Sequence, residues 1–221
     1  MDFGSIVGAV LLLGIVVYMV WFAVPPATDG RVVLFDGSMP GDARQSFLVA
    51  IPRSFDQPEG LTYSYTAWIL VKDFTKGYGT KRRIFSKGDS PGLYLDSTSN
   101  SLLVAVDTYG ATETILIPNI PAMKWIQFAL VVDQHSVDIY INGILRKHHT
   151  LGQLPQQNDN AVAVGGEWSG VLSRLNYYPR SLTPVQVKEM LKEKLPSDLE
   201  RAVSGPNYFD ISWYIGRLYS A

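Results

Sequence analysis

Few residues of this sequence have the types and spacing that enzyme catalysis requires. The only acidic residues two positions apart, a spacing that aims two carboxylates to one side of a strand, are Asp198 and Glu200. None of His135, His148 and His149 lies in the glycine-flanked turn of a serine nucleophile. His148 and His149 would face opposite sides of a strand and could not easily share a metal ion. We therefore expect no catalytic site and ordinary strand histidines.

The composition excludes further kinds of chemistry. Among 221 residues there is no cysteine, which rules out disulfides, thiolate metal sites and cysteine nucleophiles. The formal net charge of −1 provides no global positive field, so we expect no nucleic-acid partner. The lack of cysteine also favours a reducing compartment for the body of the protein.

Aromatic residues beside polar loop residues indicate binding instead. Glycan recognition uses exposed rings next to hydrogen-bonding groups, and the best set here is Trp168 in GGEWSG with Tyr78 and Tyr109. The alternative is that these three rings pack on the rim of the fold. They are the candidate glycan or partner contacts.

Two further segments could contact a partner. A basic patch surrounds the GYG sequence at 77–79 and could meet anionic lipid headgroups or an acidic partner, or could simply protect a sheet edge from aggregation; its residues are Lys76, Lys81, Arg82 and Arg83. The stretch 205–221 is too apolar to be left in water. It could return onto its own domain, or dock on a neighbouring subunit or a membrane surface, through Tyr208, Phe209, Trp213, Tyr214 and Tyr219.

The N-terminal segment predicts a membrane anchor. Residues 3–24 carry no charge, and a helix of that length reaches ~33 Å, enough to cross a hydrocarbon core. Aromatic residues crowd its end, and Pro25 and Pro26 stop it. A cleaved signal peptide is the alternative, but neither Lys nor Arg precedes the apolar run. We expect a single-pass membrane protein with the lipid bilayer as one partner.

The flanks of this anchor bear on its orientation and pairing. Arg31 and Arg44 follow the helix while no basic residue precedes it, which slightly favours a C-terminal domain on the cytoplasmic, reducing side. Gly4 and Gly8 have the spacing that lets two membrane helices approach closely, a short motif that also recurs by chance.

After the prolines, short β-branched and aromatic runs alternate with turn residues, as in a β-sandwich. Asn142 and Gly143 predict a type I′ hairpin, because both residue types accept positive φ angles. Thr183, Pro184 and Gln186 predict a capped helix that ends by Pro196. The expected strands are 31–35, 46–51, 63–71, 82–87, 92–96, 101–107, 113–117, 125–133, 137–141, 144–149, 161–165 and 171–178.

The order of these segments over roughly residues 30–195 resembles the laminin-G-like branch of the concanavalin A-like lectin and glucanase superfamily. The segments that carry the resemblance are YTAWI (65–69), IFSKGD (84–89), GLYLD (92–96), KWIQFALVVD (124–133), VDIYINGILRK (137–147) and VLSRLNYYPRSLTPVQV (171–187).

This resemblance implies an all-β, two-sheet antiparallel jelly-roll sandwich at 27–195, between an anchor at 1–26 and an aromatic tail at 196–221. Its core or core margins would include Trp68, Phe85, Leu93, Trp125, Phe128 and Tyr140. The Glu-x-Asp-x-x-Glu motif of related glucanases is missing. We expect no cofactor and no metal. Laminin-G modules often hold calcium at a loop rim, so calcium is the alternative; its ligands would be Asp89, Asp96 and Asp107 with Asn100, residues that also serve simply as turn formers.

Two functions fit these expectations. The first, which we favour from the sequence, is a membrane-anchored, non-catalytic scaffold that contacts protein neighbours in an assembly. Short, anchored, cysteine-free versions of this fold resemble proteins of large DNA viruses, which implies a minor capsid or inner-membrane component of a virion. The second is a membrane-tethered, lectin-like glycan-binding module that faces outward.

Overall fold

The computed structural model describes residues 13–14, 30–52, 54, 61–88 and 90–193. The aromatic tail and the predicted anchor, apart from two of its residues, lie outside this part of the chain, so both stay predictions. Within the described part, no helix has the length and apolar character needed to cross a membrane. The sandwich begins at Val32 and belongs to a compact unit of its own.

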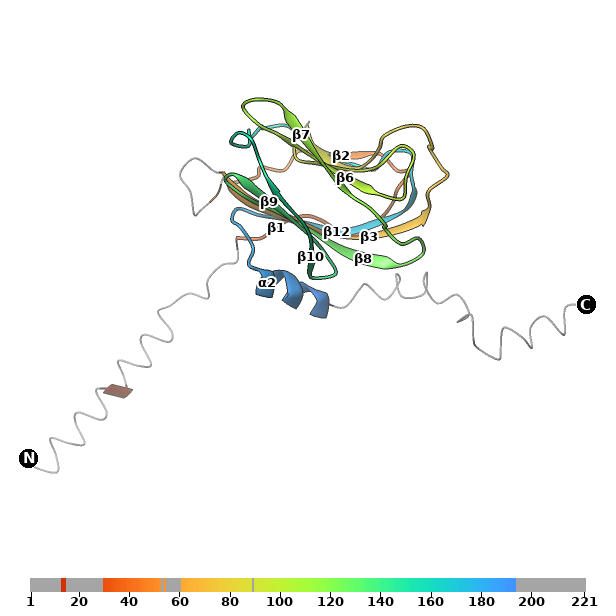
Figure 1. The fold of residues 1–221 in the computed structure, drawn as a ribbon. Helices are drawn as coiled ribbons and strands as arrows, with labels where there is room; N and C mark the ends of the chain where they lie inside the picture. The colour runs from red at the N-terminus through yellow and green to blue at the C-terminus, as the bar shows by residue number, and fades with distance from the viewer. Residues whose placement is uncertain (1–12, 15–29, 53, 55–60, 89, 194–221) are drawn as a thin grey trace, which may run out of the picture. The chain divides into compact units, whose positions relative to one another are not determined.

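Two antiparallel sheets of six strands each form the sandwich, stacked one on the other (Figure 1). The first sheet contains, in spatial order, β1 (Val32–Pro40), β12 (Ser169–Tyr178), β3 (Thr62–Asp73), β8 (Trp125–Asp133), β9 (Ser136–Ile141) and β10 (Ile144–Thr150). The second contains β2 (Gln45–Phe47), β11 (Val162–Val164), β4 (Arg82–Lys87), β5 (Gly92–Leu95), β6 (Leu102–Asp107) and β7 (Thr112–Ile117). The predicted all-β, two-sheet fold is confirmed.

The core lies between the two sheets because alternate residues of each strand point inward. On β3, Tyr63, Tyr65, Ala67 and Ile69 are all buried in this core. Of the six predicted core residues, Phe85, Leu93 and Phe128 are fully buried between the sheets. Tyr140 is buried in a second cluster, and Trp68 and Trp125 are half-buried.

Local sequence signals are confirmed at two turns. Asn142 and Gly143 join β9 to β10 with φ angles of 52° and 70°, and the Asn142 side chain also accepts a hydrogen bond of 2.8 Å from the backbone N–H of Gln127. Thr183 caps helix α2 (Pro184–Glu189) in a capping box with Gln186. A 3₁₀ turn, η1 (Met190–Lys192), follows, so the regular helix is shorter than predicted.

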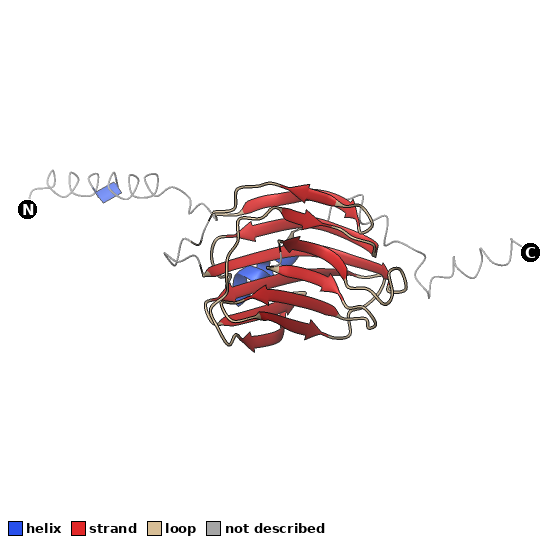
Figure 2. Cartoon of the chain, turned by 90° about the horizontal axis from the view of Figure 1, so that it is seen from above, coloured by secondary structure: helices blue, strands red, loops and turns tan. Residues whose placement is uncertain are grey.

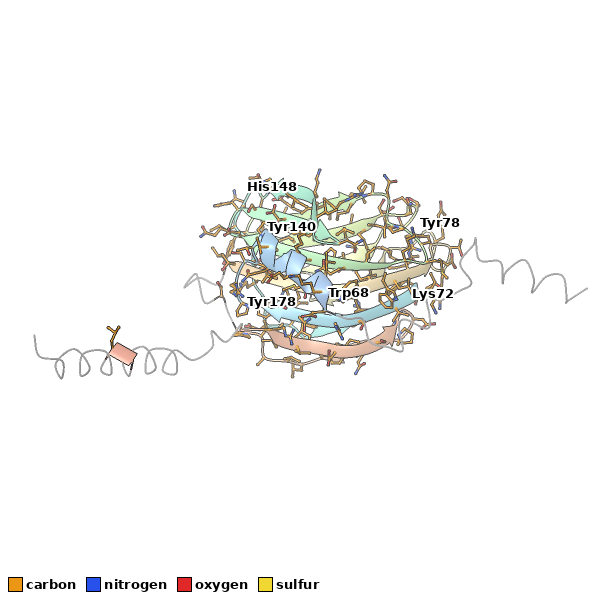
Figure 3. All side chains as sticks on the ribbon, turned by 90° about the horizontal axis from the view of Figure 1, so that it is seen from below. Trp68, Lys72, Tyr78, Tyr140, His148 and Tyr178 are labelled. Carbon is orange, nitrogen blue, oxygen red and sulfur yellow. The ribbon has the colours of Figure 1, made fainter. Side chains whose placement is uncertain are left out.

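Helix α2 covers part of the outer face of the first sheet (Figure 3). Seen from the opposite side, the helix lies beneath the strands (Figure 2). Leu182 and Val187 are buried there against Val131, Tyr140 and Tyr178. The outer face of the first sheet therefore has its own apolar cluster at this position.

Adjacent histidines on β10 bond to different carboxylates. His148 lies 2.6 Å from Asp138 of the neighbouring strand β9. His149 lies 2.7 Å from Glu113, which belongs to β7 of the other sheet. Glu113 also accepts a 2.8 Å hydrogen bond from the Gly152 N–H. The prediction that the two histidines share no metal is consistent with this geometry, and His149 ties the edges of the two sheets together.

Trp168 is completely buried, at 0% exposure, so the prediction that it is a surface ring is wrong. The indole lies across Gly41 and Gly170, where an added Cβ would come within 2.4 Å and 2.2 Å of the ring. Glycine at both places leaves a slot for the ring. The loop sequence around Trp168 therefore closes over the core and does not present the ring to solvent.

We expect Trp168→Ala to lower the free energy of unfolding by about 3–5 kcal/mol, because it empties a buried slot. Urea unfolding followed by near-ultraviolet circular dichroism measures this. The matched control is Tyr78→Ala, which removes an exposed ring and should change stability by less than about 0.5 kcal/mol. Equal stability of both variants would contradict the burial of Trp168.

The Glu113 contact predicts a pH dependence of stability. The hydrogen bond to His149, and after it that from Gly152, holds the pKa of Glu113 below its ordinary value of 4.5. Such a group stabilises the fold above the unfolded-state pKa, and the contribution is lost as pH falls through the lowered pKa. Wild type should therefore exceed Glu113→Gln in stability at pH 6, by less than about 1 kcal/mol since both side chains are partly exposed. In urea titrations this advantage should become progressively smaller as the pH falls below 4.5. An advantage that stays constant with falling pH would contradict the role of the Glu113 carboxylate.

Candidate functional site

A cleft lies at one end of the sandwich. About 380 Å³ of space lies there, open to solvent. The start of β3, the turn between β4 and β5 and the segment before β11 all border it. Its lining residues are Ile51, Pro52, Tyr63, Tyr65, Lys87, Ser90, Pro91, Gln156, Gln157, Asn158, Asp159 and Tyr177.

The floor of the cleft is aromatic. The Tyr65 ring meets the rings of Tyr63 and Tyr177 edge-on, at centroid distances of 5.9 Å and 5.1 Å, and stacks on Phe85 at 5.6 Å. Burial raises the pKa values of Tyr63 and Tyr177 well above the ordinary phenol value. Their hydroxyls therefore stay neutral and can both donate and accept hydrogen bonds; that of Tyr177 donates to the Pro52 carbonyl at 2.8 Å.

Hydrogen bonds hold the rim in place. The Asn158 side chain donates to the carbonyls of Lys87 and Ser90, at 3.0 Å and 2.6 Å. Lys87 in turn donates to the Asn158 carbonyl. Ser90 accepts from the Asp107 N–H at 2.8 Å, and the Asp107 carbonyl accepts from Gln156 at 2.8 Å. The turn after β4, the end of β6 and the segment before β11 thus form one network, which favours a preformed site.

Three polar side chains of the rim are available to a ligand. Gln156 and Asp159 are exposed, Gln157 is half-buried, and within the described residues their side chains make no hydrogen bond. Two amides and a carboxylate above neutral phenols suit a neutral molecule with many hydroxyl groups. The sequence prediction missed this cleft, although the unbroken polar run QQNDN at 156–160 is a signal that could have pointed to it.

The three aromatic residues predicted to contact a glycan do not form one site. Trp168 is buried, whereas Tyr78 and Tyr109 are 65% and 70% exposed. Tyr78 precedes Arg82 at one end of β4, and Tyr109 follows Asp107 at the end of β6 that lies near Gly92. Antiparallel pairing of β4, β5 and β6 therefore puts Tyr78 and Tyr109 at opposite ends of the sandwich. Tyr109 shares its end with the cleft, since its N–H donates to the Leu154 carbonyl at 3.0 Å.

The calcium candidates do not converge either. Asp96 and Asp107 lie at opposite ends of the second sheet, and Asp89 is outside the described residues. Asp96 closes a turn, in which hydrogen bonds from the Ser99 hydroxyl and then the backbone lower its carboxylate pKa. Asp107 accepts from the Thr112 hydroxyl. Among described residues there is no group of three His, Asp or Glu side chains that could hold a metal ion. The prediction that these residues form one rim is wrong.

The basic patch is not a common surface, because Arg82 is buried. Its guanidinium donates to the carbonyls of Phe74, Lys76 and Asp96, and so fixes the loop that follows β3. Lys76 pairs with Asp42 at 2.8 Å, and Lys81 lies 3.7 Å over the ring of Tyr94. Arg83 donates to the Gly165 carbonyl at 3.3 Å. The prediction of an exposed four-residue patch is therefore wrong for Arg82, and contact of Lys76 and Lys81 with a partner stays a prediction.

No curated protein matches the sequence. Solved structures that share the fold include the binding domain of botulinum neurotoxin serotype D, with 11% identity, a TM-score of 0.53 and coverage of 70% of this chain and 41% of that one. A structure of botulinum neurotoxin type C, whose cell entry depends on interaction with two ganglioside molecules, has 11% identity, a TM-score of 0.54 and coverage of 74% and 51%. The binding domain of Paraclostridial Mosquitocidal Protein 1 has 16% identity, a TM-score of 0.52 and coverage of 73% and 46%.

At these identities the likeness shows the fold, and this chain spans about half, or less, of the length of those structures. The match of the sequence to a family profile is more specific than the structural likeness. Residues 42–188, most of the sandwich, match the sequence profile of a laminin-G-type family described as concanavalin A-like lectin/glucanases superfamily. The chain therefore belongs to the concanavalin A-like lectin/glucanases superfamily.

Proposed function

We propose that this chain is a non-catalytic, lectin-like module that binds a glycan in the cleft and is held at a membrane by residues 3–24. The observation that carries the proposal is the set of unengaged side chains of Gln156, Gln157 and Asp159 above a floor of neutral tyrosines. Such groups offer both donors and acceptors to sugar hydroxyls, while the hydrogen-bonded rim supplies a preformed shape.

A binding role is favoured over hydrolysis by the charges in the cleft. Glycoside hydrolysis in most families uses two carboxyl groups on either side of the scissile bond. Asp159 is the single carboxylate among the described residues that line the cleft. A further support is the structural likeness to botulinum neurotoxin type C. Cell entry of that toxin depends on interaction with gangliosides, which are lipids that carry a glycan.

A second candidate is the scaffold role in a membrane-associated assembly, including that of a minor capsid or inner-membrane component of a virion. Its support is the aromatic tail, which offers an adhesive segment, and the position of Arg31 and Arg44 after the apolar run, which favours the cytoplasmic side. A lectin-like role requires the sandwich on the outer side of the membrane. Labelling of exposed lysines in intact cells or particles by a membrane-impermeant reagent therefore separates the two candidates.

We expect the full-length chain, in detergent micelles, to bind members of a glycan array, and Gln157→Ala or Asp159→Asn to weaken that binding about tenfold. The physical reason is the loss of one or two hydrogen bonds to the sugar, about 1.4 kcal/mol in all. Isothermal titration with the strongest array ligand measures the change.

The matched control is Gln153→Ala, an exposed glutamine of the same segment that does not line the cleft. Its binding should equal that of wild type, as should its circular dichroism spectrum. A protein that binds no glycan, or one whose cleft variants bind as tightly as the control, would overturn the lectin-like proposal.

A further inference from the structure

A second, smaller pocket lies on the outer face of the first sheet, beside the end of η1. It has about 240 Å³ of space. Trp68 lies next to the end of the helical segment, on the face seen in Figure 3. The pocket is lined by residues from β3, β8, β12 and η1 and by the residue after η1, among them Thr66, Trp68, Gln127, Asn176, Met190 and Glu193.

Within the described ranges, one side chain in this pocket, that of Gln127, lacks the hydrogen bonds that a buried amide needs. Gln127 is 1% exposed, yet among the described residues neither the oxygen nor the nitrogen of its amide has a hydrogen-bond partner. Two residues earlier, and so on the same face of β8, the indole nitrogen of Trp125 is also buried, and no residue in the described part of the chain bonds to it. A buried amide that is left unpaired destabilises a fold, so we expect Gln127 to have a partner.

Helix α2 does not supply it. The apolar cluster under the helix involves Val131, Tyr140 and Tyr178. The helical segment ends at Lys192, beside the pocket that Trp68 also lines, and the rings of Trp68 and Trp125 on this face of the sheet stay partly exposed. The exposed parts of these two rings lie next to a polar pocket, which suits a peptide that carries both rings and hydrogen-bonding groups.

The chain itself provides such a peptide. The described part ends at Glu193, which is part of the wall of the pocket. Residues 207–214 read NYFDISWY, with an amide, a carboxylate and a hydroxyl between four aromatic rings. The connecting residues could reach up to ~45 Å, so the pocket is well within range. A segment joined to the pocket wall also acts at an effective concentration of the order of millimolar, which favours it over a second copy of the chain.

We propose that residues 207–214 bind in cis across Trp68 and Trp125, and that an amide of this segment pairs with the side chain of Gln127. The aromatic tail would then cover the parts of Trp68 and Trp125 that stay exposed on the outer face of the first sheet. This inference does not depend on the carbohydrate cleft, which lies at an end of the sandwich.

The absence of cysteine makes cross-linking a direct test. Lys72 lies on the same face of β3 as Trp68, and both are labelled in Figure 3. In the full chain in detergent micelles, Lys72→Cys combined with Ser212→Cys should form an intramolecular disulfide. In the matched control, Leu116→Cys takes the place of Lys72→Cys and is combined with the same Ser212→Cys. Leu116 is an exposed residue of β7 in the other sheet. We expect the Lys72 pair to form at least about ten times faster than the Leu116 pair.

Two further substitutions test the contacts themselves. Gln127→Leu and, separately, Trp213→Ser should each slow formation of the Lys72 pair several-fold, while Ser220→Ala, outside the docking segment, should not. The tail variant changes none of the described packing, so it remains informative if Gln127→Leu unfolds the sandwich. Equal rates for the Lys72 and Leu116 pairs, a disulfide that joins two chains, or a rate unchanged by Trp213→Ser would each overturn the proposal.

Discussion

The burial of apolar side chains between the inner faces of the two sheets is the interaction on which the rest of this structure depends. β3 lies inside the first sheet and contributes an unbroken alternation of buried residues to it. Because this layer fixes the distance and the register of the sheets, it also fixes where the connecting segments begin and end. The tyrosines at the start of β3 are at once the edge of the core and the floor of the cleft, so the binding site is an extension of the core.

Polar side chains, one buried and one partly buried, organise the two ends of the sandwich in a similar way. At one end, the guanidinium of Arg82 binds three backbone carbonyls. At the other end, the side chain of Asn158 binds two. Both side chains satisfy carbonyls that a loop cannot pair within itself, and this is the reason that the loops are held close to the sheets. The cleft lies at the Asn158 end, where the same bonds that satisfy the backbone also shape the rim.

The strands, the hairpin at Asn142 and the cap at Thr183 could be predicted because each depends on neighbours in sequence, through alternation or through the φ angles of one turn. Trp168 and Arg82 were predicted wrongly because their burial depends on distant partners. Gly41 and Gly170 make room for the indole, and carbonyls from two loops receive the guanidinium. The cleft forms where segments around residues 63, 90 and 157 lie next to one another. These segments are far apart in the sequence, so no local pattern predicts their contact. The fold was therefore far more predictable than the site.

Strand β10 forms one free edge of the first sheet, and its composition has a consequence for crowding. A bare edge can add a strand from another molecule and grow into a continuous sheet. Here the edge is exposed along nearly its whole length and carries Arg146, Lys147, His148 and His149 in succession. Copies that approach edge to edge would bring these cationic and hydrated groups together. This edge is therefore a poor template for a strand from a second copy of the protein.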